Sequence, residues 1–221
     1  MIAEIAAMFR QAPVIAITDS WFSNNGLYAP LRKKLGQRFH MVSRLGSNNN
    51  LFEMLDPCAK RDRGRPRKYG TKLGDDSSQA LAYQPLASEY KVTLYGRPRR
   101  VLAYERIAML KTLKTAVKVV WVYRKTQWVA LFSTDLTLTA QEIIEYYGAR
   151  WKIEAASKEL KRDIGNAGTQ TRHPNAVANH LHFCMMATSL TWIYASRLEK
   201  TPSVGMQLTA AVILPSPMFE G

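Results

Sequence analysis

Cysteine and acidic side chains are both scarce in this chain. Its 221 residues include two cysteines, Cys58 and Cys184, and four histidines. So few cysteines exclude a disulfide scaffold and a cysteine-rich zinc site, and they favour a reducing compartment such as the cytoplasm. Asp and Glu number 17 against 31 Lys and Arg, which gives a formal net charge of +14. This excess predicts a polyanionic partner, most commonly nucleic acid.

No stretch of the sequence has the pattern of a membrane span or a secretory signal. Glu4 interrupts the apolar residues 1–11, and no small-residue cleavage site follows them. Residues 177–196 carry no charge, but polar side chains punctuate them: Asn179, His180, His182, Thr188, Ser189 and Thr191. A lipid-spanning helix would be more uniformly apolar, so we expect a buried helix and no membrane partner. The 47% of hydrophobic residues suffices for a core and excludes a wholly disordered chain.

The first part of the chain alternates between strand and helix patterns. Residues 14–18 form a continuous apolar, β-branched run, which predicts a strand buried on both faces, and Asp19 follows it directly. Turn residues 23–26 offer caps for a helix over 27–35, and Gly36 is suited to end it. A second strand is expected over 39–45. This order predicts an α/β fold.

The middle of the chain combines basic residues with strand patterns. Residues 57–73 hold one acid, Asp62, and seven basic residues: Lys60, Arg61, Arg63, Arg65, Arg67, Lys68 and Lys72. Such a run is either a solvated loop or an arm that contacts phosphates. Strands are expected over 90–94, 100–105, 117–123 and 128–133. Trp121 and Trp128 in these strands are candidates for the core or for stacking on an unpaired base.

A long helix is expected over residues 138–164. Thr139 and Glu142 have the spacing of a capping box, and Gly165 is suited to end the helix. A further helix is expected over 175–198, beginning at Pro174, and residues after 200 should be poorly ordered.

At 100° per residue the long helix has an apolar stripe that should face the core, made of Tyr146, Ile153, Leu160 and Ile164. At its margin lie Tyr147, Arg150, Glu154 and Lys161. Arg150 and Glu154 could simply form an i,i+4 ion pair worth about 0.2–0.5 kcal/mol. Alternatively, one acid among cations suits a phosphate substrate. Asp19, at the end of a buried strand, would then join Glu154 as a second oxygen ligand for a hard divalent cation.

The spacing Tyr147-x2-Arg150-x3-Glu154-x6-Lys161 resembles the Tyr-Arg-Glu-Lys signature of bacterial insertion-sequence transposases of the DDE type. Residues 149–154 are similar to the family's Arg-Trp-x-Ile-Glu stretch, and residues 17–22 resemble the segment around its second catalytic Asp. Residues 63–67 are similar to a basic segment of its β-rich insertion. The resemblance implies an RNase H-like catalytic domain that carries out metal-dependent DNA strand cleavage and transfer at insertion-sequence ends.

The resemblance also implies roles for particular residues. Asp19 and Glu154 would be catalytic and would hold Mg²⁺ or Mn²⁺. Tyr147, Arg150 and Lys161 would contact DNA near the scissile phosphate. Further DNA contacts would come from the basic run: Arg63, Arg65, Arg67 and Lys68. The partners would be the terminal inverted repeats, with a homodimer or pairing with full-length transposase, in a bacterial cytoplasm near the nucleoid.

The chain departs from the family pattern at the first catalytic Asp. Only 18 residues precede Asp19, and their sole acid is Glu4. We therefore expect a truncated RNase H-like domain, the C-terminal portion of a transposase, inactive alone. Expected boundaries are 1–45 for the first part of the core, 46–134 for a basic β-rich insertion, 135–198 for the part with the Glu helix, and 199–221 for the tail. A non-catalytic DNA-binding fragment and an unrelated basic RNA-binding protein are the alternatives.

Overall fold

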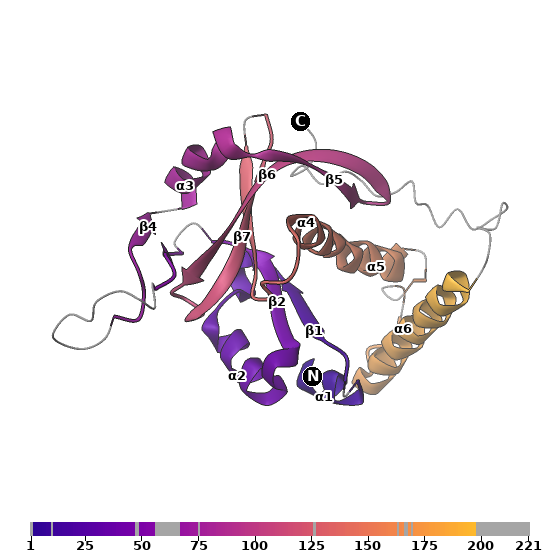
Figure 1. Cartoon of the computed structure of the whole chain (residues 1–221). Coiled ribbons are helices and arrows are strands. Elements are labelled where there is room, and N and C mark those ends of the chain that lie inside the picture. Colours follow the sequence, from indigo (N-terminus) through magenta and orange to yellow (C-terminus); the bar gives the residue numbers. More distant parts are fainter. Residues whose placement is uncertain are drawn as a thin grey trace. The chain divides into compact units, whose positions relative to one another are not determined.

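A computed structural model of the chain is drawn in Figure 1. It describes residues 2–9, 11–46, 49–55, 67–74, 76–125, 127–162, 164–165, 168 and 170–197. The predicted tail at 199–221 and most of the basic run at 57–73 lie outside the described residues. The chain forms two compact units, Met1–Ala149 and Arg150–Glu220. Mixed strands and helices confirm the predicted α/β fold class.

The first unit begins with a strand–helix–strand segment, as the sequence predicts. After α1 (Ile2–Met8), strand β1 (Val14–Thr18) pairs in parallel with β2 (Phe39–Arg44), and α2 (Asn25–Leu35) connects them. The Asn24 side chain caps α2 by accepting a hydrogen bond from the Leu27 amide, at 3.2 Å. Gly36 ends the helix with a φ of 63°, a conformation that glycine adopts without strain.

The sheet continues through strands that lie far along the chain. Its order is β1-β2-β8-β7-β6-β3-β4, with β5 paired to β6 (Figure 1). β8 (Trp128–Ser133) pairs antiparallel with β2, and β7 (Thr115–Tyr123), β6 (Arg97–Leu110) and β5 (Ser88–Leu94) follow in antiparallel pairs. All four predicted strands of the middle region are present, and β6 extends five residues beyond the predicted end at 105. The strands within 46–134 thus join the sheet of β1 and β2, while the domain boundaries stay a prediction.

Three short elements complete this region, and the sequence patterns did not indicate them. They are β3 (Leu51–Phe52), β4 (Lys72–Gly74) and α3 (Asp76–Tyr83). The Tyr83 ring stacks on Tyr104 and meets Trp121 edge-on, with centroids 4.5 Å and 5.0 Å apart. Trp121 is fully buried, which confirms a core position, and Trp128 is partly buried against the same core.

One prediction for β1 is wrong. All five of its residues are half-buried rather than buried on both faces. The reason is its position, because in the described sheet β1 is the first strand and pairs only with β2. An edge strand has a neighbour on one side only, and its apolar side chains are covered less completely.

Two helices replace the predicted long helix over 138–164. α4 (Ala140–Ala149) ends the first unit, and α5 (Trp151–Arg162) begins the second, with Arg150 in a turn between them. The interruption makes the predicted apolar stripe wrong, because helical angles do not carry across a break. Tyr147 is buried rather than Tyr146, and Ile153 is 65% exposed. The capping box is confirmed: the Thr139 amide donates to Glu142 Oε2 at 2.8 Å, and the Glu142 amide donates to Thr139 Oγ1 at 3.2 Å.

The second unit contains α5 and α6 (Pro174–Ser196), which begins at Pro174 as predicted. Cys184 is buried, but most other described side chains of α6 are exposed, so the predicted buried helix is wrong. Its apolar residues are distributed all around the helix, and one neighbouring helix covers only one stripe of it. Among the described residues, no helix has both the length and the apolar content to cross a membrane.

Candidate functional site

Asp19 lies directly after β1, where the chain turns out of the sheet. Its Oδ1 accepts a hydrogen bond from the Ser20 amide at 2.7 Å and so caps the short 3₁₀ helix Ser20–Phe22. The side chain is exposed, and no described residue hydrogen-bonds its Oδ2. One carboxylate oxygen therefore fixes the orientation of Asp19, and the other can meet a ligand from solvent.

The end of β1 is anchored to the neighbouring strand. The buried Ser43 hydroxyl on β2 donates to the Thr18 carbonyl at 2.9 Å. This bond adds to the parallel ladder, in which Thr18 is the register partner of Ser43. The backbone just before Asp19 is thus held in place by the pairing of β1 with β2, which favours a well-defined direction of the Asp19 side chain.

Tyr147 and Gly148 lie near the end of α4, packed against β5 in the first unit. A Cβ on Gly148 would lie 2.5 Å from Leu94 Cδ2, so any larger residue would require the Leu94 side chain or α4 to shift. On the exposed side of the same helix, Glu145 Oε1 accepts the Thr93 amide at 2.7 Å and the Gln141 amide nitrogen at 3.1 Å. Tyr147 itself is only 3% exposed. α4 is therefore held on β5 just before the segment that carries Arg150 and Glu154.

Arg150 and Glu154 form an ion pair at the start of the second unit. Arg150 Nη1 donates to Glu154 Oε1 at 3.2 Å, with the Arg and Glu side chains 18% and 46% exposed. The Arg150 guanidinium also lies 5.7 Å from the Trp151 ring centroid, within cation–π range. The i,i+4 pair that the spacing allowed is thus present. Such a pair stabilises little, and its presence leaves the role of Glu154 open to functional tests.

Lys161 lies two turns along α5 from Glu154 and is exposed. The seven-residue separation puts the two side chains on one side of the helix. Lys158, four residues after Glu154, shares this side, and the predicted set did not include it. A carboxylate followed by two cations along one helix side is suited to a phosphate-bearing ligand.

The remaining predicted site residues are distributed as follows. Arg63 and Arg65 lie outside the described residues, and Arg67 and Lys68 are exposed next to Tyr69, whose ring contacts Phe52 at 5.2 Å between centroids. Asp19 belongs to the first unit and Glu154 to the second. Their convergence on one ion stays a prediction. Among the described side chains, no three His, Cys, Asp or Glu groups form a cluster that could hold a metal ion.

Asp135, just after β8, is a further acid with a fixed side chain, and it was not among the predicted site residues. Its Oδ1 accepts hydrogen bonds from the Thr137 hydroxyl and amide at 2.7 Å and 3.0 Å, and Oδ2 lies 3.9 Å from His40 Nε2. Burial alone would raise the pKa of Asp135, but the Thr137 hydrogen bonds and the nearby His40 and Lys118 outweigh it and lower this pKa. An Asp two residues before a Thr at a strand end is a typical turn signal that could have indicated this group.

A mixed sheet flanked by helices, with an exposed carboxylate where an edge strand ends, is consistent with an RNase H-like transposase domain. Comparison with protein families gives a match over residues 1–190 to the family described as "Transposase DDE domain", and the chain belongs to this family. No curated protein matches the chain. Membership implies a role in DNA transposition with DNA as the substrate, and the family generally depends on divalent metal ions.

Proposed function

We propose that the chain supplies two metal-binding carboxylates, Asp19 and Glu154, to metal-dependent DNA strand cleavage and transfer at insertion-sequence ends. The observation that carries the proposal is Asp19. Its side chain is exposed after an edge strand, one oxygen is held by the Ser20 amide, and the other is open to a ligand. Glu154 is proposed as the partner because it occupies the Glu position of the Tyr-Arg-Glu-Lys spacing in a chain of this family.

Carboxylate oxygens are the ligands that Mg²⁺ and Mn²⁺ prefer, so the donor chemistry of Asp19 and Glu154 fits these ions. When bound, such ions activate the attacking oxygen and stabilise the leaving oxygen in phosphoryl transfer. The Ser20 amide keeps Asp19 oriented, and Arg150 holds Glu154 in place through Oε1. The first catalytic Asp of the family pattern is not assigned to a residue here. We therefore propose that this chain alone does not cleave DNA.

The proposed DNA contacts are cations beside these acids and in the basic run. Arg150 and Lys161 would hold phosphates near Glu154, and Arg67 and Lys68, with Arg63 and Arg65, would contact other phosphates of the backbone. Tyr147 completes the proposed set, although its burial means that a DNA contact would require local movement of α4. The proposed partners are the terminal inverted repeats of the DNA and either a second copy of this chain or a full-length transposase. We propose that the protein acts close to the nucleoid.

Metal binding by the whole chain tests the shared site directly. Mn²⁺ affinity would be measured by calorimetry for the wild type, Asp19→Asn, Glu154→Gln and the double variant, with Glu159→Gln on the same helix as a matched control. If both acids hold one ion, each single variant weakens binding and the double variant is little weaker than either, because the site is already lost. Additive losses, or losses equal to the control, would show that the two acids do not share an ion.

A cleavage assay with Mg²⁺ and matched terminal repeats tests the proposed inactivity of the chain alone. We expect no strand cleavage or joining. Turnover that disappears in Asp19→Ala and Glu154→Ala would overturn this claim while supporting the catalytic role of the two acids. DNA binding that persists in chelator, together with Mn²⁺ affinity unaffected by either substitution, would instead favour a non-catalytic DNA-binding fragment.

A further inference from the structure

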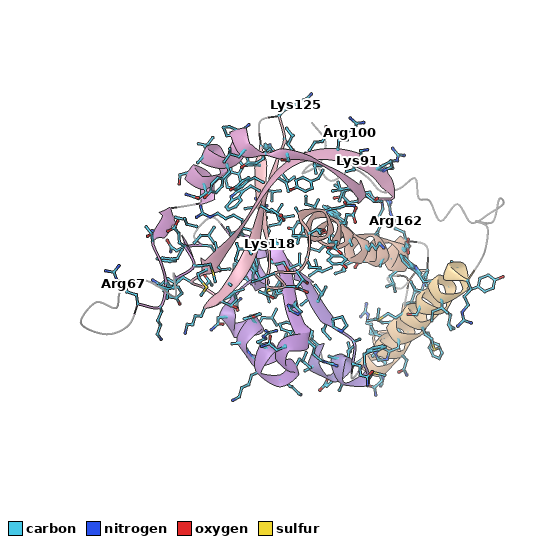
Figure 2. All side chains as sticks on the ribbon, viewed as in Figure 1. Arg67, Lys91, Arg100, Lys118, Lys125 and Arg162 are labelled. Atoms are coloured by element: carbon cyan, nitrogen blue, oxygen red, sulfur yellow. The ribbon has the colours of Figure 1, made fainter. Side chains whose placement is uncertain are left out.

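A group of cations lies on the β5–β6 hairpin and in the turn that follows β7, and none of its members belongs to the proposed site. Residues 88–101 and 123–127 contain six basic side chains and one acid, Glu89. The basic residues are Lys91, Arg97, Arg99, Arg100, Arg124 and Lys125. Lys91, Arg100 and Lys125, which we call the tip surface, are exposed, and Figure 2 labels all three in the upper part of the view.

Strand register places two members of the tip surface, Lys91 and Arg100, on one side of the sheet. Lys91 on β5 pairs directly with Arg100 on β6. Tyr123 on β7 pairs with Leu102, and Lys125 follows two residues later in the turn to β8. Paired residues on adjacent strands point to the same face, and strands lie about 4.8 Å apart. Lys91 and Arg100 therefore lie side by side on one face of β5 and β6, and Lys125 lies in the turn that follows β7.

The opposite face of β5 is the one that packs inward. Val92 and Leu94 are buried, whereas Lys91 and Thr93, which alternate with them, are exposed. The inward residues fix the strand, so the tip surface cannot turn toward the core without exposing them. The turn that joins β5 to β6 is tight, with Tyr95 at a φ of 55° and Gly96 at 73°, which is the hairpin geometry that matches strand twist. The cations are thus carried on a well-defined scaffold.

The charges of the tip surface do not serve folding. Like charges on directly opposed strand residues are destabilising, and Lys91 faces Arg100 in this way. Glu89 lies 3.5 Å from Arg100, but both side chains are more than half exposed, and exposed pairs of this kind contribute little. A row of cations that costs stability and is only partly neutralised is typical of a surface that meets a polyanion.

We propose that the tip surface binds the phosphate backbone of duplex DNA, through Lys91, Arg100 and Lys125 and without reading sequence. This inference rests on the proposed function for its choice of DNA as the polyanion. Lys and Arg side chains are common donors to phosphate oxygens, and such contacts carry no sequence information directly. The contact would hold a DNA segment on the β5–β6 hairpin, through residues other than those proposed to act at the scissile phosphate.

Salt-dependent DNA binding by the full chain tests the tip surface. Fluorescence anisotropy with a labelled duplex of arbitrary sequence would compare the wild type with Lys91→Gln/Arg100→Gln/Lys125→Gln. The matched control, Lys33→Gln/Lys34→Gln/Lys111→Gln, removes the same charge from other exposed positions of the first unit. Each lost phosphate contact lowers the salt slope by about 0.9. Between about 50 and 200 mM salt the wild-type affinity should therefore fall about 40-fold more than that of the tip variant.

The charge-preserving variant Lys91→Arg/Arg100→Lys/Lys125→Arg should keep the wild-type slope, which separates loss of charge from loss of folding. An unchanged slope in the Gln variant, or an equal loss in the control, would overturn the inference and leave the carboxylate proposal intact. A stronger dependence on the three residues for duplex RNA or for anionic vesicles would overturn the choice of DNA. Absence of any duplex binding by the wild type would overturn the inference together with the proposed DNA contacts, while the Mn²⁺ measurement would still test Asp19 and Glu154.

Discussion

Gly148 sets how closely α4 approaches β5, and Gly148→Ala measures the energetic consequence. In a helix, Ala is favoured over Gly by about 1 kcal/mol. However, the new methyl carbon would lie 2.5 Å from Leu94 Cδ2, and Leu94 is only 1% exposed in a filled core. Overpacking of this kind costs about 1–3 kcal/mol. The clash should outweigh the helix preference, and we expect a net loss of about 1 kcal/mol in the free energy of unfolding.

Urea unfolding followed by circular dichroism would check this expectation. With a denaturant dependence of about 2 kcal/mol per molar urea, the midpoint should fall by about 0.5 M without a change in slope. The same substitution in a Leu94→Ala background supplies the matched comparison. Leu94→Ala alone should cost about 2–5 kcal/mol, but it opens the space that the new methyl group needs. In the Leu94→Ala background, Gly148→Ala should raise the free energy of unfolding by about 1 kcal/mol. The difference between this gain and the loss of about 1 kcal/mol in the unchanged chain is a coupling free energy of about 2 kcal/mol between positions 94 and 148.

Two outcomes would refute this reasoning. If Gly148→Ala stabilised the otherwise unchanged chain by the full helix preference, α4 would not approach β5 as closely as the structure has it. If the effect were the same in both backgrounds, Leu94 would not be the group that limits position 148. Either result would also weaken the argument that β5 holds the end of α4 just before Arg150 and Glu154.

Two further predictions concern an acid and an aromatic of the first unit. The pKa of Asp135 is lowered in the folded chain from its ordinary value of 3.8, so its contribution to stability is complete above that value and is lost as the pH falls through the folded pKa. In urea unfolding at a series of pH values, Asp135→Asn should therefore reduce the loss of unfolding free energy below about pH 4. An unchanged pH profile would contradict the role of Thr137. Trp121 is fully buried, so Trp121→Ala should lower the free energy of unfolding by about 3–5 kcal/mol, and Trp128→Ala should lower it less. A stable Trp121→Ala variant with weakened DNA binding would instead indicate that Trp121 stacks on a base.

The sequence by itself determined the local structure of the first unit and of the helix starts. Asn24, Gly36 and the Thr139–Glu142 capping box act within a few residues, and each is found where the pattern predicts it. The strand over 128–133 was predicted to the residue, because alternation and turns are also local. The residue spacing around Glu154 indicated the family, and the comparison over residues 1–190 confirms that family.

Only the tertiary structure decided which of these local elements meet. The pairing of β8 with β2 joins positions about ninety residues apart, and nothing in either strand specifies the other. β1 is half-buried because of its place at the sheet edge, although its composition suits full burial. Likewise, Tyr147 is buried and the helix is interrupted at Arg150, although the 3.6-residue period continues through both.

The tip surface also depends on tertiary structure rather than on local sequence. Lys91, Arg100 and Lys125 are spread over 35 residues of an ordinary basic chain, and the pairing of β5 with β6 and of β6 with β7 brings the segments that carry them into neighbouring positions. Local propensity depends on a residue and its near neighbours, whereas register and burial depend on which distant surfaces pack together. The sequence therefore set the charges, the caps and the elements, and the packing of those elements set which charges lie together.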